Sequence, residues 1–403
     1  MKRMGFKEFL FILPAIVLIV FFSLWPIYKV ITYSVFDYQL NDQQKSKLST
    51  EEKFNVDLFM ENSDYVIMFI DMNRASFPED VQGKVDETIN NVNSFKEVLS
   101  GQSGFITLSG SLKSQVRSCY DRLIEDTDFF INNYDFPDKE NLGLVMEDTK
   151  KCFVQSNFIG LKGYLNAFKD ERVGAALSHT VVFTLISVAI EFVLGLGLAI
   201  IMNKAMRGQG VIRAVSLIPW AIPTTVAALM WSYLYDGSSG IVAHILQNLH
   251  LVKDSKDLLL SGGGAMASAI IADVWKTTPY MALLILAGFQ TIPGTVYESA
   301  KVDGSGIFNT FFKITLPLLK PSILVALLMR TLDAFRVFDL IYVLTGGGPG
   351  GSTETMSIYA YKTMFQQTNF GYGSIVVILM VIAVAVIATF FIKILGANVM
   401  ERD

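Results

Sequence analysis

Residues 298–319 read ESAKVDGSGIFNTFFKITLPLL, and this stretch lies between two long apolar segments. It begins with a carboxylate and small residues, and it continues through aromatic residues to Ile-Thr-Leu-Pro. Residues 296–302 keep helical spacing, and Gly304 can end that helix because glycine readily takes a positive φ. The pattern therefore predicts a helix, a turn and a second helix, which Pro317 and Pro321 would end before the next apolar segment.

The apolar segments are long enough to cross a membrane. The chain of 403 residues is 52% hydrophobic and 17% charged, with a mean hydropathy of +0.43. A run of about 20 apolar residues spans a bilayer as a helix, because a helix satisfies its own backbone polar groups. The sequence therefore predicts an all-α polytopic membrane protein with six transmembrane helices. The six runs are 8–30, 177–202, 212–235, 266–290, 321–344 and 374–396.

The first apolar run has features of both a signal peptide and an anchor. Lys2, Arg3 and Lys7 precede it, as in the start of a signal peptide. The run continues to Trp25 and Tyr28, however, without a cleavage site of small residues. We therefore expect residues 1–35 to hold a retained first transmembrane helix.

Basic residues near the span ends predict the orientation of the chain. They gather at the N-terminus, after the second run and in residues 291–320, which all fall on one side of the membrane if six spans are present. We therefore expect residues 291–320 to form a cytoplasmic loop, with both chain ends cytoplasmic. The basic residues after the second run and in this loop are Lys204, Arg207, Arg213, Lys301, Lys313 and Lys320.

An acidic block separates the first two runs. Residues 36–160 contain 12 Lys and Arg against 22 Asp and Glu, whereas the remainder of the chain contains 21 against 15. A block of this length can form its own core, and its position between two spans places it outside the cell. Residues 65–71 and 104–110 read as strands, while 81–92 and 112–123 keep helical spacing. The block is predicted to be a small inserted α+β domain.

Both cysteines of the chain, Cys119 and Cys152, lie in this block. An oxidising exterior permits a disulfide between them, but two buried thiols fit the sequence equally well. No CxxC pair occurs, and the three histidines are scattered, so no metal site is predicted. His179 is expected to have a packing role near the start of the second span.

Motifs for nucleotide or covalent chemistry are missing from the sequence. It contains no GxxxxGK[ST] loop, no nucleophile elbow and no zinc motif. We therefore expect a protein that is not an enzyme and that binds no cofactor of its own. If the process is driven, a partner or an ion gradient supplies the energy.

The stretch at residues 298–319 resembles the EAA coupling motif of ABC importer permeases. In that family the short helix of the loop docks into a groove of the ATPase subunit, which binds ATP and magnesium. The family has alanine where this chain has Ser299, which is a mild change in size. The residues that the resemblance assigns to this coupling loop are Glu298, Ser299, Ala300, Gly304, Ile314, Leu316 and Pro317.

The resemblance extends to sugar-importer permeases of the maltose type, over residues 1–35 and 157–403. It is carried by WKTTPYMALLILAGFQTIP at 275–293 and by FDLIYVLTGGGPGGSTETMSIYAYKTMF at 338–365. It implies a type I ABC importer permease in a bacterial inner membrane, with residues 161–403 as a permease core of five transmembrane helices. The implied partners are ATPase subunits, a second and different permease in a heterodimer, membrane lipid, an extracellular solute-binding protein and a sugar substrate, but no nucleic acid.

The acidic block is not clearly covered by the resemblance. The larger permease subunit of maltose transporters has an outer domain in the corresponding loop, where it contacts the solute-binding protein. By position, residues 36–160 would therefore help to dock a binding protein. An elaboration without that role remains the alternative.

Polar residues within two predicted spans suggest a path for the solute, because such residues usually face a cavity or a partner. Asp273, Lys276, Thr277 and Tyr280 fall on one helical face. Carboxylates and amines bind sugar hydroxyls, and aromatic rings cover apolar sugar faces. The resemblance places the sugar site at these positions and near Asp333, Ala334, Arg336 and Val337, although the maltose protein is amide-rich there.

A purely structural explanation of these charges also fits the sequence. Arg330 with Asp333, Arg336 with Asp339, and Asp273 with Lys276 could each neutralise one another within a helix. Two other functions also remain open. They are an ion-coupled secondary transporter that uses Asp273 or Asp333, and a membrane sensor with an outer ligand-binding domain.

Overall fold

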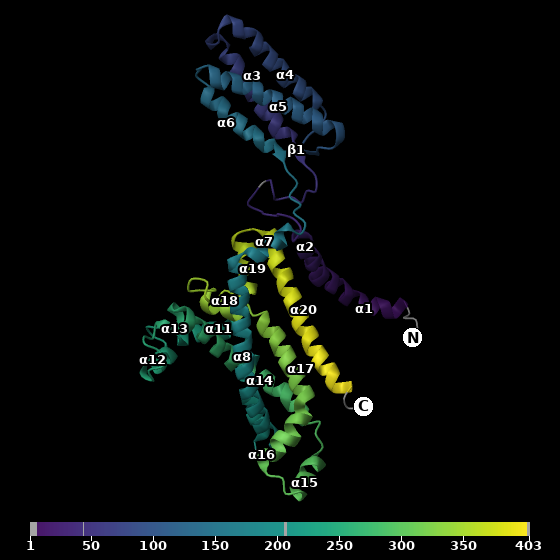
Figure 1. Cartoon of the computed structure of the whole chain (residues 1–403), viewed down its shortest axis with the longest axis vertical. Coiled ribbons are helices and arrows are strands. Elements are labelled where there is room, and N and C mark those ends of the chain that lie inside the picture. Colours follow the sequence, from purple (N-terminus) through teal and green to yellow (C-terminus); the bar gives the residue numbers. More distant parts are fainter. Residues whose placement is uncertain (1–5, 43, 205–207, 401–403) are drawn as a thin grey trace. The chain divides into compact units, whose positions relative to one another are not determined.

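The computed structural model describes residues 6–42, 44–204 and 208–400 (Figure 1). The chain divides into two compact units. The outer unit is Val35–Gly160, and the membrane unit combines Met1–Ser34 with Leu161–Asp403.

The outer unit is mainly a bundle of helices with a small antiparallel sheet. The strands run in the order β2-β1-β3, and Phe54 of the central strand lies opposite Ile106 and Phe153. Short 3-10 turns connect the helices at Arg74–Ser76, Glu79–Val81 and Lys150–Cys152. The main elements are β1 (Lys53–Asn55), α3 (Val56–Met72), α4 (Gln82–Val98), β2 (Phe105–Thr107), α5 (Gly110–Asn133), α6 (Lys139–Thr149) and β3 (Phe153–Val154).

One predicted strand of the outer unit is wrong. Residues 65–71 belong to the helix α3, where Phe59, Val66 and Ile70 recur at helical spacing and are fully buried. The Asn55 side chain accepts a hydrogen bond from the Leu58 amide and caps this helix. A window of seven residues is too short to show that periodicity, so its β-branched and aromatic residues suggested a strand. The strand predicted at 104–110 is present as the three residues of β2.

The core of the outer unit is built from aromatic rings. Phe54, Phe59 and Phe95 are fully buried, and the rings of Phe59 and Phe95 have centroids 4.1 Å apart. The buried carboxylate of Asp126 on α5 accepts a hydrogen bond of 2.6 Å from Lys84 on α4. That bond raises the pKa of Lys84 and joins two helices at the edge of the apolar core.

The two cysteines are free thiols in the structure, so the disulfide considered from the sequence is not formed. Cys152 packs into the apolar core at the end of a 3-10 turn, and Cys119 is partly buried on α5. Burial raises the pKa of the Cys152 thiol to about 12, because the core disfavours a thiolate. Both side chains therefore act as small apolar groups.

The membrane unit consists of helices, of which several are bent or broken. In order they are α1 (Phe6–Ile19), α2 (Trp25–Tyr33), α7 (Lys162–Lys169), α8 (Glu171–Asn203), α9 (Gln209–Ser216), α10 (Ile218–Ala221), α11 (Thr224–Leu234), α12 (Ile241–Asn248), α13 (Asp257–Leu260), α14 (Gly262–Phe289), α15 (Gly294–Val302), α16 (Ile307–Thr310), α17 (Leu316–Phe335), α18 (Asp339–Thr345), α19 (Met356–Tyr361) and α20 (Phe370–Met400). Single π-helical turns at Val20–Leu24, Phe311–Thr315 and Lys362–Gln366 continue α1, α16 and α19.

Five helical segments of the described chain are long and apolar enough to cross a membrane. The segment predicted as a third span at 212–235 is instead a pair, Gln209–Ala221 and Thr224–Leu234, bent by 87°. The break falls at Ile222, because Pro223 disfavours a helical conformation in the residue before it. If this pair counts as one span, the number rises to six. The five segments are Phe11–Tyr33, Glu171–Asn203, Gly262–Phe289, Ile307–Phe335 and Phe370–Ile394.

The span that follows residues 298–319 begins earlier than the predicted 321–344. It runs continuously over Ile307–Phe335, so Pro317 and Pro321 do not end a helix as predicted. Proline lacks an amide donor, and the π-helical turn just before Pro317 adjusts the hydrogen bonding, with the Leu316 amide bonded to the Phe311 carbonyl. The second helix of the predicted loop therefore continues directly into the span.

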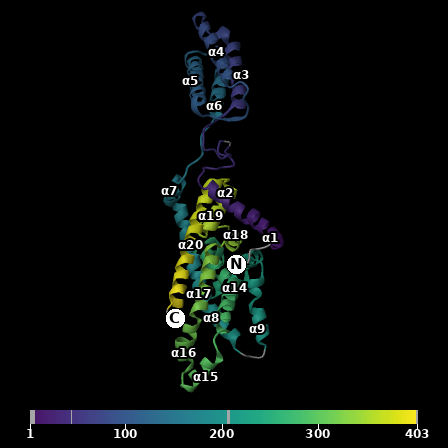
Figure 2. The same cartoon turned by 90° about the vertical axis from the view of Figure 1, so that its right-hand side faces the viewer.

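The helices α8, α14 and α17 lie side by side (Figure 2), and glycines bring them close together. A Cβ atom on Gly195 of α8 would lie 2.7 Å from Met281 Cγ on α14. A Cβ atom on Gly288 of α14 would lie 2.4 Å from the Ser322 hydroxyl on α17. Both contacts are too short for any side chain larger than hydrogen, so these positions set the spacing of the three helices.

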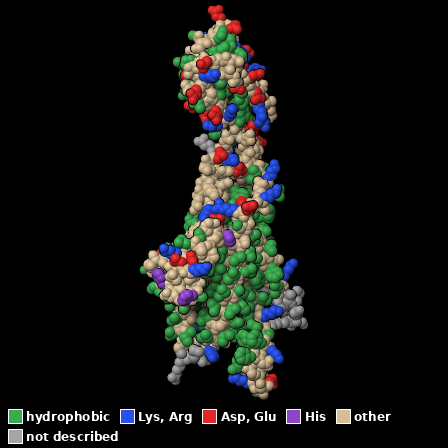
Figure 3. Space-filling model, turned by 60° about the vertical axis from the view of Figure 1, so that its left-hand side comes forward, with side chains coloured by type: hydrophobic (Ala, Val, Ile, Leu, Met, Phe, Trp, Pro, Cys, Tyr) green, Lys and Arg blue, Asp and Glu red, His purple; other side chains and the backbone are tan. Residues whose placement is uncertain are grey.

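The outward surface of the membrane unit is apolar. Figure 3 shows hydrophobic side chains over much of this surface, and large exposed side chains include Leu185 and Val193 of α8 and Phe390 of α20. The segment Phe11–Tyr33 has none of its most apolar window buried. Such surfaces are expected to contact lipid or another transmembrane subunit.

Candidate functional site

A polar cavity of about 490 Å3 opens inside the membrane unit. Its walls come from the break between α10 and α11, from α14, from the end of α17 and from the turn into α18. The chain can form it here because α11 turns away at Ile222 and α17 ends at Phe335, so two helices leave space at the same point. The lining residues are Trp220, Ala221, Ile222, Pro223, Thr224, Asp273, Lys276, Thr277, Arg330, Asp333, Ala334, Arg336, Val337, Phe338, Asp339 and Leu340.

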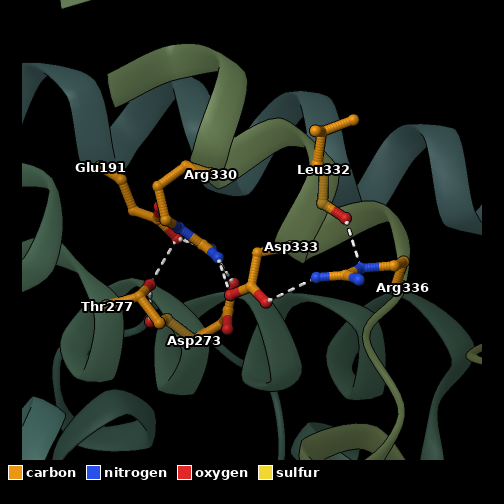
Figure 4. A network of polar contacts seen from close by, with 7 residues as sticks. All are labelled: Glu191, Asp273, Thr277, Arg330, Leu332, Asp333 and Arg336. Carbon is orange, nitrogen blue, oxygen red and sulfur yellow. Dashed lines mark hydrogen bonds and ion pairs between the residues drawn. The ribbon is translucent and has the colours of Figure 1, made fainter. Parts of the chain in front are cut away.

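Arg330 is the centre of an ion-pair network at the cavity wall (Figure 4). Its Nε donates to Glu191 Oε2 at 2.6 Å, and its Nη2 donates to Glu191 Oε1 at 2.7 Å. The same Nη2 reaches Asp273 Oδ2 at 2.9 Å, while Nη1 donates to Asp333 Oδ2 at 2.8 Å. One guanidinium thus joins α8, α14 and α17.

The members of this network differ in their access to solvent. The side chains of Glu191, Arg330 and Asp273 are 0%, 1% and 8% exposed, whereas that of Asp333 is 60% exposed. Burying charged groups is costly unless they are paired and hydrogen-bonded. The network therefore has a buried part with two carboxylates on one guanidinium, and one carboxylate that remains accessible from the cavity.

Lys276 is held by the broken helix. Its Nζ donates to the Ile222 carbonyl at 2.6 Å and lies 3.4 Å from the Trp220 carbonyl. These carbonyls lie where α10 ends and the chain turns, and a helix leaves its last carbonyls without amide donors of its own. The expected pairing of Lys276 with Asp273 is wrong, since Asp273 pairs with Arg330 across helices.

The turn after α17 separates Arg336 from Asp339. Arg336 ends the helix and its Nη2 lies 3.8 Å from Asp333 Oδ1, so the expected pair with Asp339 is replaced by one with Asp333. Thr277 places its hydroxyl 2.7 Å from Glu191 Oε1 and 2.6 Å from the Asp273 carbonyl.

Six of the seven predicted path residues lie together on this cavity, and Tyr280 is the exception. Tyr280 stacks on Trp220 with ring centroids 5.6 Å apart and an angle of 12° between planes. Trp220 and Phe338 line the cavity, so the aromatic surface available to a solute comes from these two rings. The six residues are Asp273, Lys276, Thr277, Asp333, Arg336 and Val337.

Sequence reasoning missed Glu191 and Trp220. A lone carboxylate within the apolar segment 177–202 was itself a signal, because such a residue is expensive in a membrane unless it has a partner. The pair of Arg330 with Asp333 that the sequence suggested is present at 2.8 Å. The sequence did not suggest the further bonds of Arg330 to Glu191 and Asp273 on other helices.

The predicted loop forms a helical hairpin at the end of the membrane unit. The helix α15 contains Glu298, Ser299 and Ala300, of which only Ala300 is buried. Gly304 follows with a φ of 74°, as its predicted turn requires, and α16 begins at Ile307. Ile314 lies in the π-helical turn, and Leu316 and Pro317 begin α17.

Large apolar side chains are exposed at this hairpin. Val302, Ile307 and Phe308 are 87%, 87% and 81% exposed, and Phe312 is 60% exposed. Exposed apolar groups at one tip, next to polar residues such as Glu298, are typical of a surface that another protein covers. The hairpin is thus an apolar tip on a helix that leads directly to the cavity.

A second polar cluster ties the glycine-rich segment after α18 to α8. Arg172 binds Glu354 through two hydrogen bonds of 2.7 and 2.9 Å, and Lys362 lies 3.0 Å from the same carboxylate. His179 Nδ1 lies 3.2 Å from the Glu354 carbonyl, which agrees with a packing role. The cluster positions this segment beside the start of α8.

The architecture is that of a multi-pass helical membrane protein with a polar internal cavity, which is the class of a permease. The chain belongs to the family of binding-protein-dependent transport system inner membrane components, whose family model matches residues 191–401. Members of this family are non-catalytic membrane subunits, and a partner ATPase hydrolyses ATP. Membership therefore excludes the alternatives of an ion-coupled secondary transporter and a membrane sensor.

Curated relatives support this family assignment. The chain is 44% identical to the trehalose/maltose transport system permease protein MalF of Thermococcus litoralis over 237 residues, which are 59% of this chain and 79% of the relative. It is 44% identical to the trehalose transport system permease protein SugA of Mycobacterium tuberculosis over 240 residues, which are 60% of this chain and 76% of the relative. It is also 41% identical to the sulfoquinovosyl glycerol transport system permease protein SmoG of Agrobacterium fabrum, over 56% of this chain and 72% of the relative.

Solved structures with a related fold come from a bacterial ABC transporter involved in the import of the acidic polysaccharide alginate. One chain of that transporter aligns with a TM-score of 0.54 and 22% identity, covering 72% of this chain and 99% of that chain. The transporter in complex with an alginate pentasaccharide-bound periplasmic protein gives a TM-score of 0.52, also at 22% identity, over 69% of this chain and 93% of that chain. At this identity the likeness concerns the fold alone.

Proposed function

We propose that the chain is one of two transmembrane subunits of an ABC importer for a sugar or oligosaccharide. The observation that supports this most directly is the polar cavity, which offers hydroxyl-binding groups beside the exposed ring of Trp220. The relatives named for trehalose, maltose and sulfoquinovosyl glycerol transport agree with a polyhydroxylated solute. The cavity would form this subunit's half of the translocation path.

The hairpin of α15 and α16 would couple ATP use to this path. Its exposed apolar residues Ile307 and Phe308 suit a groove on an ATPase subunit. Because α16 continues through the π-helical turn into α17, movement of the hairpin would reach Arg330 along one helical segment. We place the hairpin and both chain ends in the cytoplasm, with six spans that include the bent pair α9–α11.

The outer unit would contact an extracellular solute-binding protein. It lies outside the residues matched by the family model, and its independent apolar core makes it a separate module. Its contribution of 22 acidic against 12 basic residues would favour a partner surface with basic groups. The second permease would be a different chain, which gives a heterodimer with a single copy of this outer module.

A pull-down in mild detergent with mass spectrometry tests the proposal. The wild type should retain an ATPase, a second permease and a binding protein, while Glu298→Arg should lose most of the ATPase. Asp303→Arg changes an exposed carboxylate of the same hairpin outside the motif and is the matched control. If the wild type is recovered alone from cells that express these partners, or if both variants lose the ATPase equally, the assignment of the coupling surface is wrong.

A further inference from the structure

Glu191 has an unusual place in the membrane unit. It is the only Asp, Glu, Lys or Arg among residues 173–203 of the helix α8. Its side chain is fully buried and does not itself line the cavity. A charge in the middle of a span is costly, so its contacts should indicate what it does.

The contacts of Glu191 fix the orientation of a guanidinium. Both carboxylate oxygens accept hydrogen bonds from Arg330, at 2.6 Å from Nε and 2.7 Å from Nη2. A bidentate pair of this kind holds the plane of the guanidinium as well as its charge. The Thr277 hydroxyl, 2.7 Å from Oε1, holds the carboxylate in turn.

The oriented guanidinium leaves Nη1 to bind Asp333, at 2.8 Å. Asp333 is the accessible carboxylate of the network, and its second oxygen lies 3.8 Å from Nη2 of the exposed Arg336. Asp333 therefore lies between two guanidiniums, one fixed and one exposed (Figure 4). If Arg330 turned away, Asp333 would be free to swing toward Arg336.

The charges do not require Glu191 for neutrality. Arg330 keeps a buried carboxylate partner in Asp273, at 2.9 Å, so the pair stays balanced without Glu191. Removing the charge of Glu191 should therefore spare the fold. What it would remove is the second anchor of the guanidinium plane, because Asp273 contacts only Nη2.

We propose that Glu191 is a positioning residue for solute binding: it holds Arg330 so that Asp333 keeps its carboxylate at the cavity wall to accept a hydrogen bond from a solute hydroxyl group. This inference rests on the proposed function of the cavity. Glu191 does not touch the solute and acts only through Arg330 and Asp333. A residue that only supports helix packing would affect assembly, whereas Glu191 should affect solute binding.

The test uses the complete complex in proteoliposomes with its binding protein, and labelled trehalose and maltose as probes. Uptake of the probe and ATP hydrolysis are measured together for the wild type, Glu191→Gln, Asp333→Asn and the double variant. A hydrogen bond to a charged group is worth roughly tenfold in binding, so each single variant should take up about tenfold less sugar per ATP hydrolysed. ATP hydrolysis itself should stay within twofold of the wild type.

The double variant tests whether Glu191 affects uptake only through Asp333. If Glu191 acts through Asp333, the double variant should lose no more uptake per ATP than Asp333→Asn alone. Glu171→Gln makes the same chemical change at the exposed start of α8 and should behave as the wild type. Glu191→Asp, which keeps the carboxylate, should recover part of the uptake.

Several outcomes would overturn the inference. Independent losses that multiply to about a hundredfold in the double variant would do so, as would a parallel fall of uptake and ATP hydrolysis in Glu191→Gln. If Glu191→Gln fails to assemble, Arg330→Lys keeps the charge but not the planar fork, and it must give the same selective loss of uptake. A wild type that hydrolyses ATP but takes up neither sugar would instead overturn the proposed substrate class, and the inference with it.

Discussion

In the outer unit the rings of Phe54, Phe59 and Phe95 fill the interior and most ion pairs lie at the surface, whereas in the membrane unit Arg330 and Glu191 are buried. The surfaces of the two units also differ in the kind of side chain that they expose. Large apolar side chains are exposed over the helices of the membrane unit, while the outer unit carries an excess of acidic residues that the remainder of the chain does not have.

The difference follows from the surroundings of each unit. In water the burial of apolar surface drives folding, so a soluble unit gains by placing its phenylalanine rings inside. In lipid an exposed leucine costs nothing, and the interior is free to hold polar groups provided that they are paired. A buried charge in the membrane unit therefore indicates a role in the solute path more strongly than a buried phenylalanine in the outer unit indicates any function.

The largest effect should come from removing the central cation of the membrane unit. Arg330→Met leaves Glu191 and Asp273 buried without a positive partner, which should cost about 3–5 kcal/mol and prevent assembly. Size-exclusion chromatography and thermal melting in detergent measure this loss. Arg336→Met, at the exposed end of the same helix, should assemble normally. If both variants melt alike, the buried network does not stabilise the unit.

A change of similar kind in the outer unit should act through apolar packing. Phe95→Ala removes a fully buried ring, which should lower the free energy of unfolding of the outer unit by about 3 kcal/mol. Limited proteolysis should then cleave within Val35–Gly160 while the membrane helices remain protected. Phe105→Ala, at a half-exposed ring of β2, is the control and should cost much less. Equal proteolysis of both units would show that they do not fold independently.

A smaller effect is expected where glycine sets the spacing of two membrane helices. Gly195→Val would force a side chain against Met281, and we expect it to destabilise the membrane unit by about 2 kcal/mol. Gly197→Val on the same helix α8 provides the control, because nothing lies within 4 Å of a Cβ atom there. Thermal melting of the two variants isolates the packing clash from the change in helix propensity. Equal melting temperatures would mean that α8 and α14 can move apart at Gly195 with little loss of stability.

The sequence predicted those features that depend on local pattern. Apolar length located the long helices, and the spacing of Asp273, Lys276 and Thr277 placed them on one face, where the structure has them on one cavity. The turn at Gly304 followed from the need for a positive φ, which the structure shows as 74°. Each of these depends on residues that are neighbours in the chain.

Features that depend on distant contacts were not predictable in this way. Glu191 and Arg330 are 139 positions apart, and no local pattern identifies either as the partner of the other. The bend at Ile222 was signalled by Pro223, but the apolar length of 212–235 outweighed it in favour of a straight span. The prediction of a strand at 65–71 was wrong because the window was too short. Helical periodicity appears only over the whole of α3.

The smallest effect concerns the reactivity of the two thiols of the outer unit, which reports how far water enters its core. The thiolate is the reactive form of cysteine, and its fraction falls about tenfold for each unit by which the pKa exceeds the pH. Burial raises the pKa of Cys152 to about 12 and also raises that of the partly buried Cys119. At pH 8 a maleimide should therefore modify Cys152 at least about tenfold more slowly than Cys119, measured in the variants Cys119→Ser and Cys152→Ser. Raising the pH to 9 should speed the reaction of both, and denaturation should make their rates equal. Similar rates in the folded protein would show that water reaches the buried Cys152 as readily as the partly buried Cys119.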